Sequence, residues 1–169
     1  MAGRRSRITG VLHFAAALLA LAAAPASAQH AGDGDIAAVR AVVDMLFDGM
    51  RERDTVKMRT AFHPDARLYG AAPDGSGVRV TQASEFVASI SQAPEGLILD
   101  EVIDDVEIRV DGPLATAWMY YDFFAGDNFS HCGYNAFQLL NVGGEWQVVS
   151  VTDSRRREGC RQQRAPAPR

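Results

Sequence analysis

The residues with the clearest chemical potential lie at positions 118–133, where two expected strands meet at Gly126-Asp127. If this pair forms a two-residue hairpin turn, Asp122 lies directly opposite His131. A carboxylate beside an imidazole stabilises the imidazolium and fixes its tautomer, which suits general acid–base catalysis. We therefore expect His131 to titrate above its usual pKa of about 6.5. A structural hydrogen bond closing one end of a sheet is the alternative.

Strand alternation extends this pair into one face that mixes aromatic and polar side chains, if Gly143-Gly144 is also a two-residue turn. Such a mixture is typical of small-molecule sites. For the aromatic members, including Trp146, packing in the core is the alternative. The opposite face is apolar and is expected to form a homodimer surface through Met119, Tyr121, Tyr134 and Val149. The residues expected to bind a ligand are Trp118, Tyr120, Asn135, Phe137, Ser150 and Tyr69.

Other catalytic chemistries have little support in the sequence. After residue 28 the histidines are His30, His63 and His131, and none has metal-ligand spacing to another histidine or cysteine. No serine stands in a nucleophile elbow, and no glycine pattern has phosphate-loop spacing. We expect neither a metal nor a cofactor.

The first 28 residues have the three parts of a secretory signal peptide. Arg4, Arg5 and Arg7 precede an apolar run over residues 11–24, and small residues at 26–28 precede Gln29. The apolar run is short for a bilayer span. A retained anchor or a buried helix is the alternative. We expect an exported protein, periplasmic or secreted, with no stable membrane insertion after cleavage at Gln29.

Cleavage would leave an acidic chain. The net charge of −4 would become −7, because residues 1–28 contain three arginines and no acidic residue. Acidic proteins repel phosphate backbones, so nucleic acid is not an expected partner. Two cysteines, Cys132 and Cys160, remain. Export favours a disulfide between them, worth roughly 3 kcal/mol, whereas a buried free thiol at Cys132 is the alternative.

Helical periodicity comes first in the chain and strand periodicity last. Apolar residues recur at helical spacing over 36–50, and shorter helices are expected after Asp54 and Thr81. From residue 97 the period changes to two, with one bulge expected near Asp104. This order indicates an α+β domain over residues 35–160. Residues 29–34 are an expected linker and residues 161–169 an expected disordered tail.

The order of elements resembles the nuclear-transport-factor-2-like superfamily. The similar segments are Phe62-His63-Pro64-Asp65-Ala66, after a second helix, and Gly144-Glu145-Trp146-Gln147-Val148. Residues 118–133, ending in Ser130-His131-Cys132-Gly133, resemble a bacterial exported subgroup labelled lumazine-binding. The resemblance implies three helices packed on a curved, mostly antiparallel sheet in a cone shape, and often a homodimer. It carries over no catalytic residue.

Three functions follow from these observations. The first is an exported protein that binds an apolar or aromatic small molecule in the cone. The second is a lyase or isomerase that uses Asp122 and His131. The third is a non-catalytic interaction domain acting through the sheet face. Binding ranks first because it requires the fewest special residues.

Overall fold

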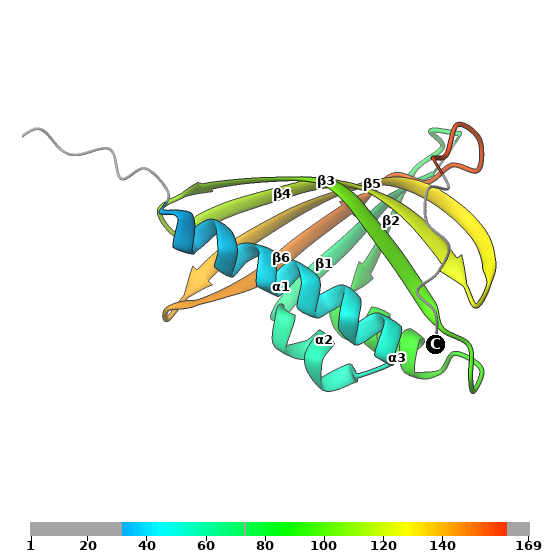
Figure 1. Cartoon of the computed structure of the whole chain (residues 1–169), viewed down its shortest axis with the longest axis horizontal. Coiled ribbons are helices and arrows are strands. Elements are labelled where there is room, and N and C mark those ends of the chain that lie inside the picture. Colours follow the sequence, from blue (N-terminus) through cyan, green and yellow to red (C-terminus); the bar gives the residue numbers. More distant parts are fainter. Residues whose placement is uncertain (1–31, 73, 162–169) are drawn as a thin grey trace, which may run out of the picture.

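The structure, a computed structural model, describes residues 32–72 and 74–161. Three helices lie on the concave side of one curved six-stranded sheet (Figure 1). The expected signal peptide, residues 29–31 of the expected linker and residues 162–169 of the expected tail fall outside the described residues. Residues 33 and 34, expected in the linker, belong to the first helix. The α+β architecture expected from the order of periodicities is confirmed. Its elements are α1 (Asp33–Glu52), α2 (Thr55–Ala61), β1 (Phe62–Ala71), β2 (Val78–Gln82), α3 (Ala83–Ser91), β3 (Leu99–Asp111), β4 (Leu114–Ala125), β5 (Asn128–Val142) and β6 (Glu145–Asp153).

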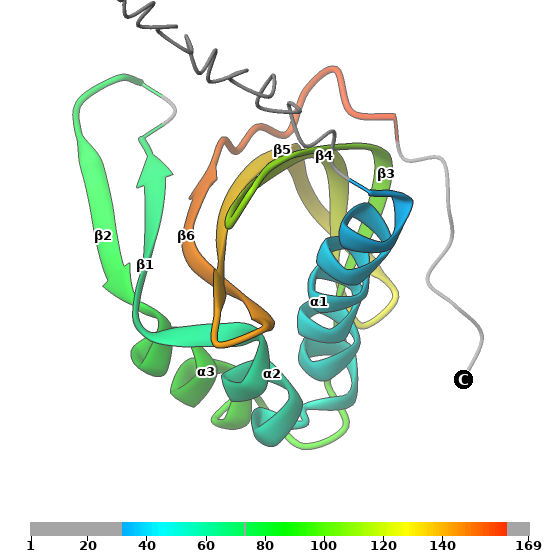
Figure 2. The same cartoon turned by 90° about the vertical axis from the view of Figure 1, so that its left-hand side faces the viewer.

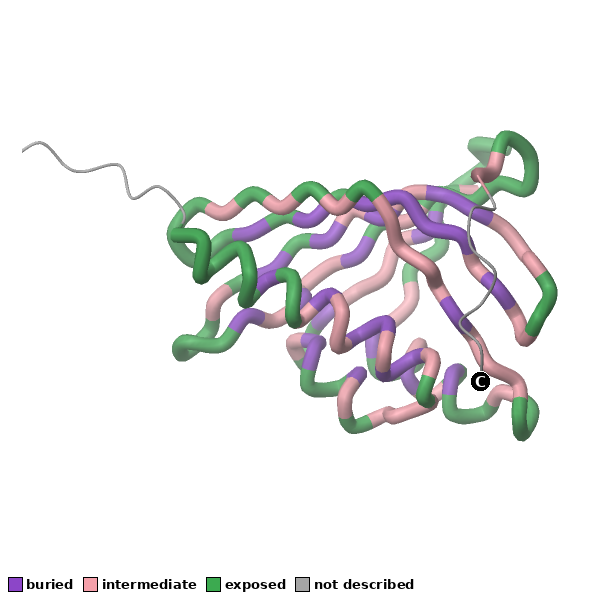
Figure 3. The backbone as a smooth tube through the Cα atoms, in the orientation of Figure 1, coloured by how far each residue is buried: buried purple, intermediate pink, exposed green. Residues whose placement is uncertain are grey.

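The sheet order is β2-β1-β6-β5-β4-β3, and every neighbouring pair is antiparallel except β1 and β6. The sheet wraps around α1, while α2 and α3 close one end of the cone (Figure 2). Burial follows this arrangement: the first turns of α1 are exposed, whereas its later turns pack inside the sheet (Figure 3). An ion pair of 3.0 Å between Arg51 and the buried carboxylate of Asp100 fastens the end of α1 to β3.

Short local signals set the helix boundaries. The carboxylate of Asp54 accepts hydrogen bonds from the backbone amides of Val56 and Lys57, and so caps the start of α2 as expected. α3 begins with a capping box between Gln82 and Glu85, one residue later than the expected cap at Thr81. Within the described residues, no helix has the length and hydropathy needed to cross a membrane.

Both expected hairpin turns are confirmed, since Ala125 pairs with Asn128 and Val142 with Glu145. The register then shifts by one residue beyond each turn. In β5, Phe129 and His131 pair with consecutive residues of β4, which leaves Ser130 as an extra residue. A one-residue shift moves every later side chain to the other face of a sheet. This bulge therefore decides which residues of β5 face the helices.

A second bulge lies in β6 and a third in β3. Leu139 pairs with Val148 and Gln138 with Ser150, so Val149 is the extra residue of β6. The bulge expected near Asp104 is confirmed, because the β3–β4 register shifts between Asp104 and Glu107. Within it, Asp105 takes a left-handed conformation with φ 50°. Bulges bend a strand and increase its twist, which suits the curvature of this sheet.

The chain beyond β6, residues 154–161, forms a C-terminal strap over the convex face of the sheet (Figure 2). Backbone hydrogen bonds in both directions between Cys132 and Arg156, each 2.9 Å, continue the β5–β6 pairing. The expected disulfide between Cys132 and Cys160 is present. Closing a loop of 28 residues stabilises the folded state by roughly 3–4 kcal/mol in the chain-entropy model.

Gly133 is required where the strap begins, because backbone and side chain approach it from two sides. A methyl group on Gly133 would lie 1.8 Å from the carbonyl oxygen of Ser154 and 2.9 Å from the ring of Tyr121. The same carbonyl accepts a 2.9 Å hydrogen bond from the hydroxyl of Tyr121. Only glycine leaves room for this contact.

We predict that Gly133→Ala lowers the free energy of unfolding by about 1–3 kcal/mol or more, because the added carbon overlaps backbone atoms that cannot rotate away. Gly34→Ala is the control, since Gly34 lies in α1 with nothing within 4 Å of the added carbon. Alanine is the better helix former, so this control should keep or raise stability. Urea unfolding measures both variants. Equal stability of the two would contradict the close approach at Gly133.

Candidate functional site

The concave side of the sheet encloses a cavity of about 170 Å³. A cavity of about 150 Å³ is known to hold benzene, so this one has room for a single-ring molecule. One end is apolar, and the other is polar and lies toward the strap. The apolar end is lined by Leu46, Phe47, Met50, Phe62, Leu68, Phe86, Ile90, Phe137 and Val151. The polar end is lined by Glu101, Tyr121, His131, Asn135, Asp153 and Arg155.

Glu101 is the central polar group of the cavity. It lies in β3 opposite Phe123 of β4, which in turn lies opposite His131 of β5. Its carboxylate accepts a 2.7 Å hydrogen bond from the side-chain amide of Asn135, a residue that is only 3% exposed. Part of Glu101 remains accessible, but its carboxyl group faces the enclosed space.

Burial raises the pKa of the Glu101 carboxyl to about 7, since the charged form loses its hydration. The hydrogen bond from Asn135 opposes this shift, and the negative charge of Asp153 adds to it. A carboxyl with this pKa exchanges protons readily near neutral pH, which is a property of general bases.

Tyr121 supplies a fixed hydroxyl to the same end. Burial, with the charges of Glu101 and Asp153, raises the pKa of Tyr121, so its hydroxyl stays protonated. Its proton is donated to the carbonyl of Ser154, which ties the cavity wall to the strap. Opposite, Asp153 and Arg155 form an ion pair at the mouth.

His131 also lines the polar end, although without the expected carboxylate partner. Its ring packs edge-on against Tyr121, with 5.7 Å between ring centroids, and lies over Phe123 at 4.9 Å. Its Nδ1 lies 3.0 Å from the hydroxyl oxygen of Ser130. Burial lowers the pKa of His131, and the nearby charge of Arg155 lowers it further. The expected increase is therefore wrong, and this imidazole is predominantly neutral at pH 7.

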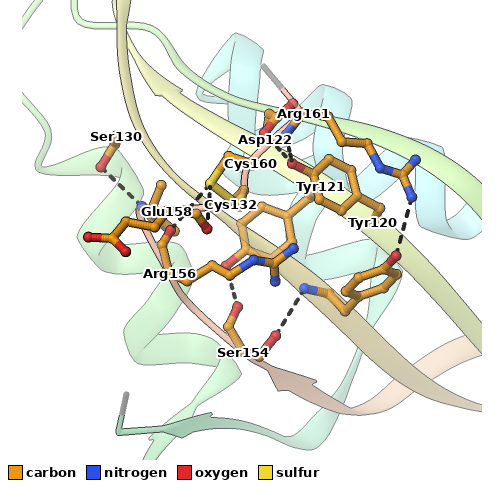
Figure 4. The surroundings of a disulfide bond; sticks show 12 residues. Tyr120, Tyr121, Asp122, Ser130, Cys132, Ser154, Arg156, Glu158, Cys160 and Arg161 are labelled. Carbon is orange, nitrogen blue, oxygen red and sulfur yellow. Dashed lines mark hydrogen bonds between the residues drawn. A yellow bond between two sulfur atoms is a disulfide. The ribbon is translucent and has the colours of Figure 1, made fainter. Parts of the chain in front are cut away.

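The expected pairing of Asp122 with His131 is wrong because Ser130 shifts the register. Asp122 lies opposite Cys132 on the convex face, beneath the strap, and is only 4% exposed. There it accepts a 2.7 Å hydrogen bond from the hydroxyl of Tyr120, which accepts a 2.8 Å bond from the backbone amide of Arg161 (Figure 4). Asp122 therefore holds the strap and does not face the cavity.

The residues expected to bind a ligand divide between the two faces. Asn135 and Phe137 line the cavity, on the face that was expected to bind a ligand. Trp118 is half exposed and stacks on Tyr134 outside the sheet, with 5.2 Å between ring centroids. Tyr120 lies under the strap. Ser150 bonds to Gln138, and neither it nor Tyr69 lines this cavity.

The side chains expected to form a dimer surface do not all lie on one exposed face. Met119 and Tyr121 are almost completely buried on the concave side, so they cannot form an exposed contact. The apolar side chains exposed on β4 and β5 are Leu114, Trp118, Leu140 and Val142.

A group of three potential metal ligands lies outside the cavity, among the residues described. One ligand atom each from Asp122, Cys132 and Cys160 lies within 4.8 Å of the others. The two sulfurs are bonded to each other, so they offer no thiolate while the disulfide is intact.

Glu101 is the site residue that the sequence interpretation missed. The bulge in β3 reverses the alternation: Leu99 and Ile103 face the core before it, and Val106 and Ile108 after it. Glu101 belongs to the first set, as an acidic residue on an inward face. Assigning inward and outward positions separately on each side of the expected bulge would have placed Glu101 on the inward face.

We predict that Glu101 makes the protein less stable as pH rises from about 4.5 to about 7. Its raised pKa means that the folded state binds a proton that the unfolded state has lost, and this contribution disappears above pH 7. In Glu101→Gln, the decrease in the free energy of unfolding between these pH values should be smaller by up to about 3 kcal/mol. Urea unfolding across pH measures it, with exposed Glu107→Gln as the control. A wild-type pH profile parallel to that of Glu101→Gln would contradict the raised pKa.

We predict that His131 titrates below about 6.5 and that Arg155→Gln raises its pKa by removing a nearby positive charge. Asp122→Asn should leave this pKa unchanged, because the two side chains lie on opposite faces. NMR titration of the His131 ring measures both effects. A fall in the pKa with Asp122→Asn would instead restore the pairing expected from the sequence.

Solved structures similar to this chain share its fold. An NTF2-like protein of unknown function from Shewanella baltica has 24% identity and a TM-score of 0.58, over 73% of this chain and 94% of its own. An NTF-2-like protein of unknown function from Silicibacter pomeroyi has 22% identity and a TM-score of 0.59, over 73% and 97%. An NTF2-like protein with a cystatin-like fold from Novosphingobium aromaticivorans has 13% identity and a TM-score of 0.61, over 76% and 85%. These similarities establish the nuclear-transport-factor-2-like fold.

No curated protein matches the sequence. A family model described as "Putative lumazine-binding" matches residues 34–152, from the first turn of α1 to the last but one residue of β6. The match covers every strand that forms the cavity and most of the described chain. The chain therefore belongs to this family, and its fold is the nuclear-transport-factor-2-like fold.

Proposed function

We propose that the protein binds a small molecule with a single-ring apolar body in the cavity inside the cone. The observation that carries the proposal is a mostly apolar cavity, open at its mouth, with Glu101, Asn135 and His131 gathered at one end. Apolar walls supply affinity through burial, while a few polar groups fix orientation. The family description, lumazine-binding, supports a small ring compound as the class of ligand.

We predict that Val151→Phe weakens binding of the neutral probe 3-phenylpropanamide at least tenfold, because the larger ring occupies the cavity. Val151 lines the cavity and is only 7% exposed, whereas Val142, 47% exposed, supplies the control Val142→Phe. Isothermal titration calorimetry measures affinity, and circular dichroism verifies that both variants are folded. Equal binding by wild type and Val151→Phe would place the probe elsewhere, and no binding to wild type would contradict the proposed function.

A second candidate function, proton transfer at a carbon next to a carbonyl, is favoured by the pKa of about 7 at Glu101. The carboxylate would take the carbon-bound proton, leaving an enolate, and would return a proton to a carbon of the same molecule. Tyr121 and Asn135 would position the polar groups around it.

We predict that the wild-type protein catalyses exchange of the α-protons of cyclohexanone with deuterium in D₂O. Glu101→Gln should reduce the exchange at least 100-fold, while Glu107→Gln keeps the wild-type rate. Proton NMR follows the loss of the α-proton signal. Equal rates with and without Glu101 would rule out this candidate and leave binding untouched.

Export and dimerisation are further parts of the proposal. The signal-peptide pattern and the disulfide both support an oxidising compartment. Export requires a mature chain beginning at Gln29, and N-terminal sequencing of secreted material that begins at Met1 would refute it.

A homodimer would use the convex face around Trp118 and Leu140, and light scattering that shows a monomer would refute the dimer.

A further inference from the structure

A groove beside the cavity mouth is lined by two arginines, whereas the cavity itself is lined by one. It lies between the β1–β2 hairpin and the strap, and its floor consists of small residues, Gly70–Ala72 and Gly77. Its charged side chains are Arg79 from β2 and Arg155 from the strap. Arg155 also lines the cavity, so the two spaces meet at this guanidinium.

The two arginines differ in their partners. Arg155 is held by the carboxylate of Asp153, which is mostly buried. Arg79 is exposed, and within residues 32–72 and 74–161 it has no hydrogen bond or ion pair. The groove therefore carries two positive charges against one negative charge, in a chain whose net charge is −4. A free guanidinium beside a fixed one is suited to an anion, since each presents paired N–H donors.

Gly70 brings these charges together. It pairs with Arg79 on one side and with Asp153 on the other. A carbon added at Gly70 would lie 3.2 Å from a terminal nitrogen of Arg79 and 3.2 Å from a carboxylate oxygen of Asp153. Both charged side chains thus extend over the position that any other residue would occupy.

We infer that the groove is an anion subsite of the proposed cavity, and that the natural ligand joins a single-ring apolar body to a carboxylate or phosphate group. The inference rests on the proposed function, because the groove is a subsite of this ligand only if the ring of the same molecule occupies the cavity. The ring lies among the apolar residues, and the anion lies between the guanidinium groups of Arg79 and Arg155. Ring and charge are then recognised by different parts of the chain.

The test compares probes that share a phenyl ring and differ in charge. They are 3-phenylpropanoate, its neutral amide 3-phenylpropanamide, and 2-phenylethyl phosphate. Calorimetry on the whole mature protein should show that at least one anion binds about tenfold more tightly than the amide. Raising the salt concentration should weaken binding of the anion and leave that of the amide unchanged. The anion that binds more tightly shows whether the subsite prefers a carboxylate or a phosphate group.

Arg79→Gln should remove most of the preference for the anion and leave the affinity for the amide unchanged, because Arg79 does not line the cavity. Arg109→Gln is the matched control, an exposed arginine of β3 at the opposite edge of the sheet, and should preserve the preference. Equal binding of amide and anions, or an unchanged preference in Arg79→Gln, would overturn the subsite and leave cavity binding intact. Binding of none of the probes would overturn both proposals.

Discussion

The backbone pairing between β5 and the start of the strap supports both faces of the sheet. On the concave face it places Asp153 and Arg155 at the cavity mouth and fixes the hydroxyl of Tyr121. On the convex face it places Cys160 where it bonds to Cys132. The pairing is possible because Gly133 lets the carbonyl of Ser154 approach. Loss of this contact would therefore affect cavity and strap together.

The sequence was sufficient to predict the elements, the turns and the disulfide. Alternation and glycine turns identify strands because they reflect local preferences. The faces could not be predicted in the same way, because Ser130 and Val149 form bulges without any unusual residue type. A bulge depends on how the whole sheet bends, and a single extra residue reverses every later position. Asp122 and His131 consequently lie on opposite faces.

The correct part of the site prediction depended on the same geometry. Asn135 and Phe137 face the cavity, since the registers of β4 and β6 still place these residues of β5 inward. Glu101 was missed because the alternation after the bulge near Asp104 does not continue before it, so the inward face of residues 99–103 has to be counted separately. Its importance follows from burial and from the amide of Asn135, which lies 34 positions away in the chain. Contacts of this kind are properties of the tertiary structure.

The pKa of Glu101 connects the cavity to its ligand. With a pKa of about 7, the carboxyl is divided between two forms at neutral pH, and small energies decide which form dominates. A ligand that donates a hydrogen bond to Glu101 favours the carboxylate, whereas one that accepts a hydrogen bond favours the protonated acid. Binding would then release or take up a proton in a direction set by the ligand's own polar group. The cavity thus selects a ligand by hydrogen-bonding polarity as well as by size.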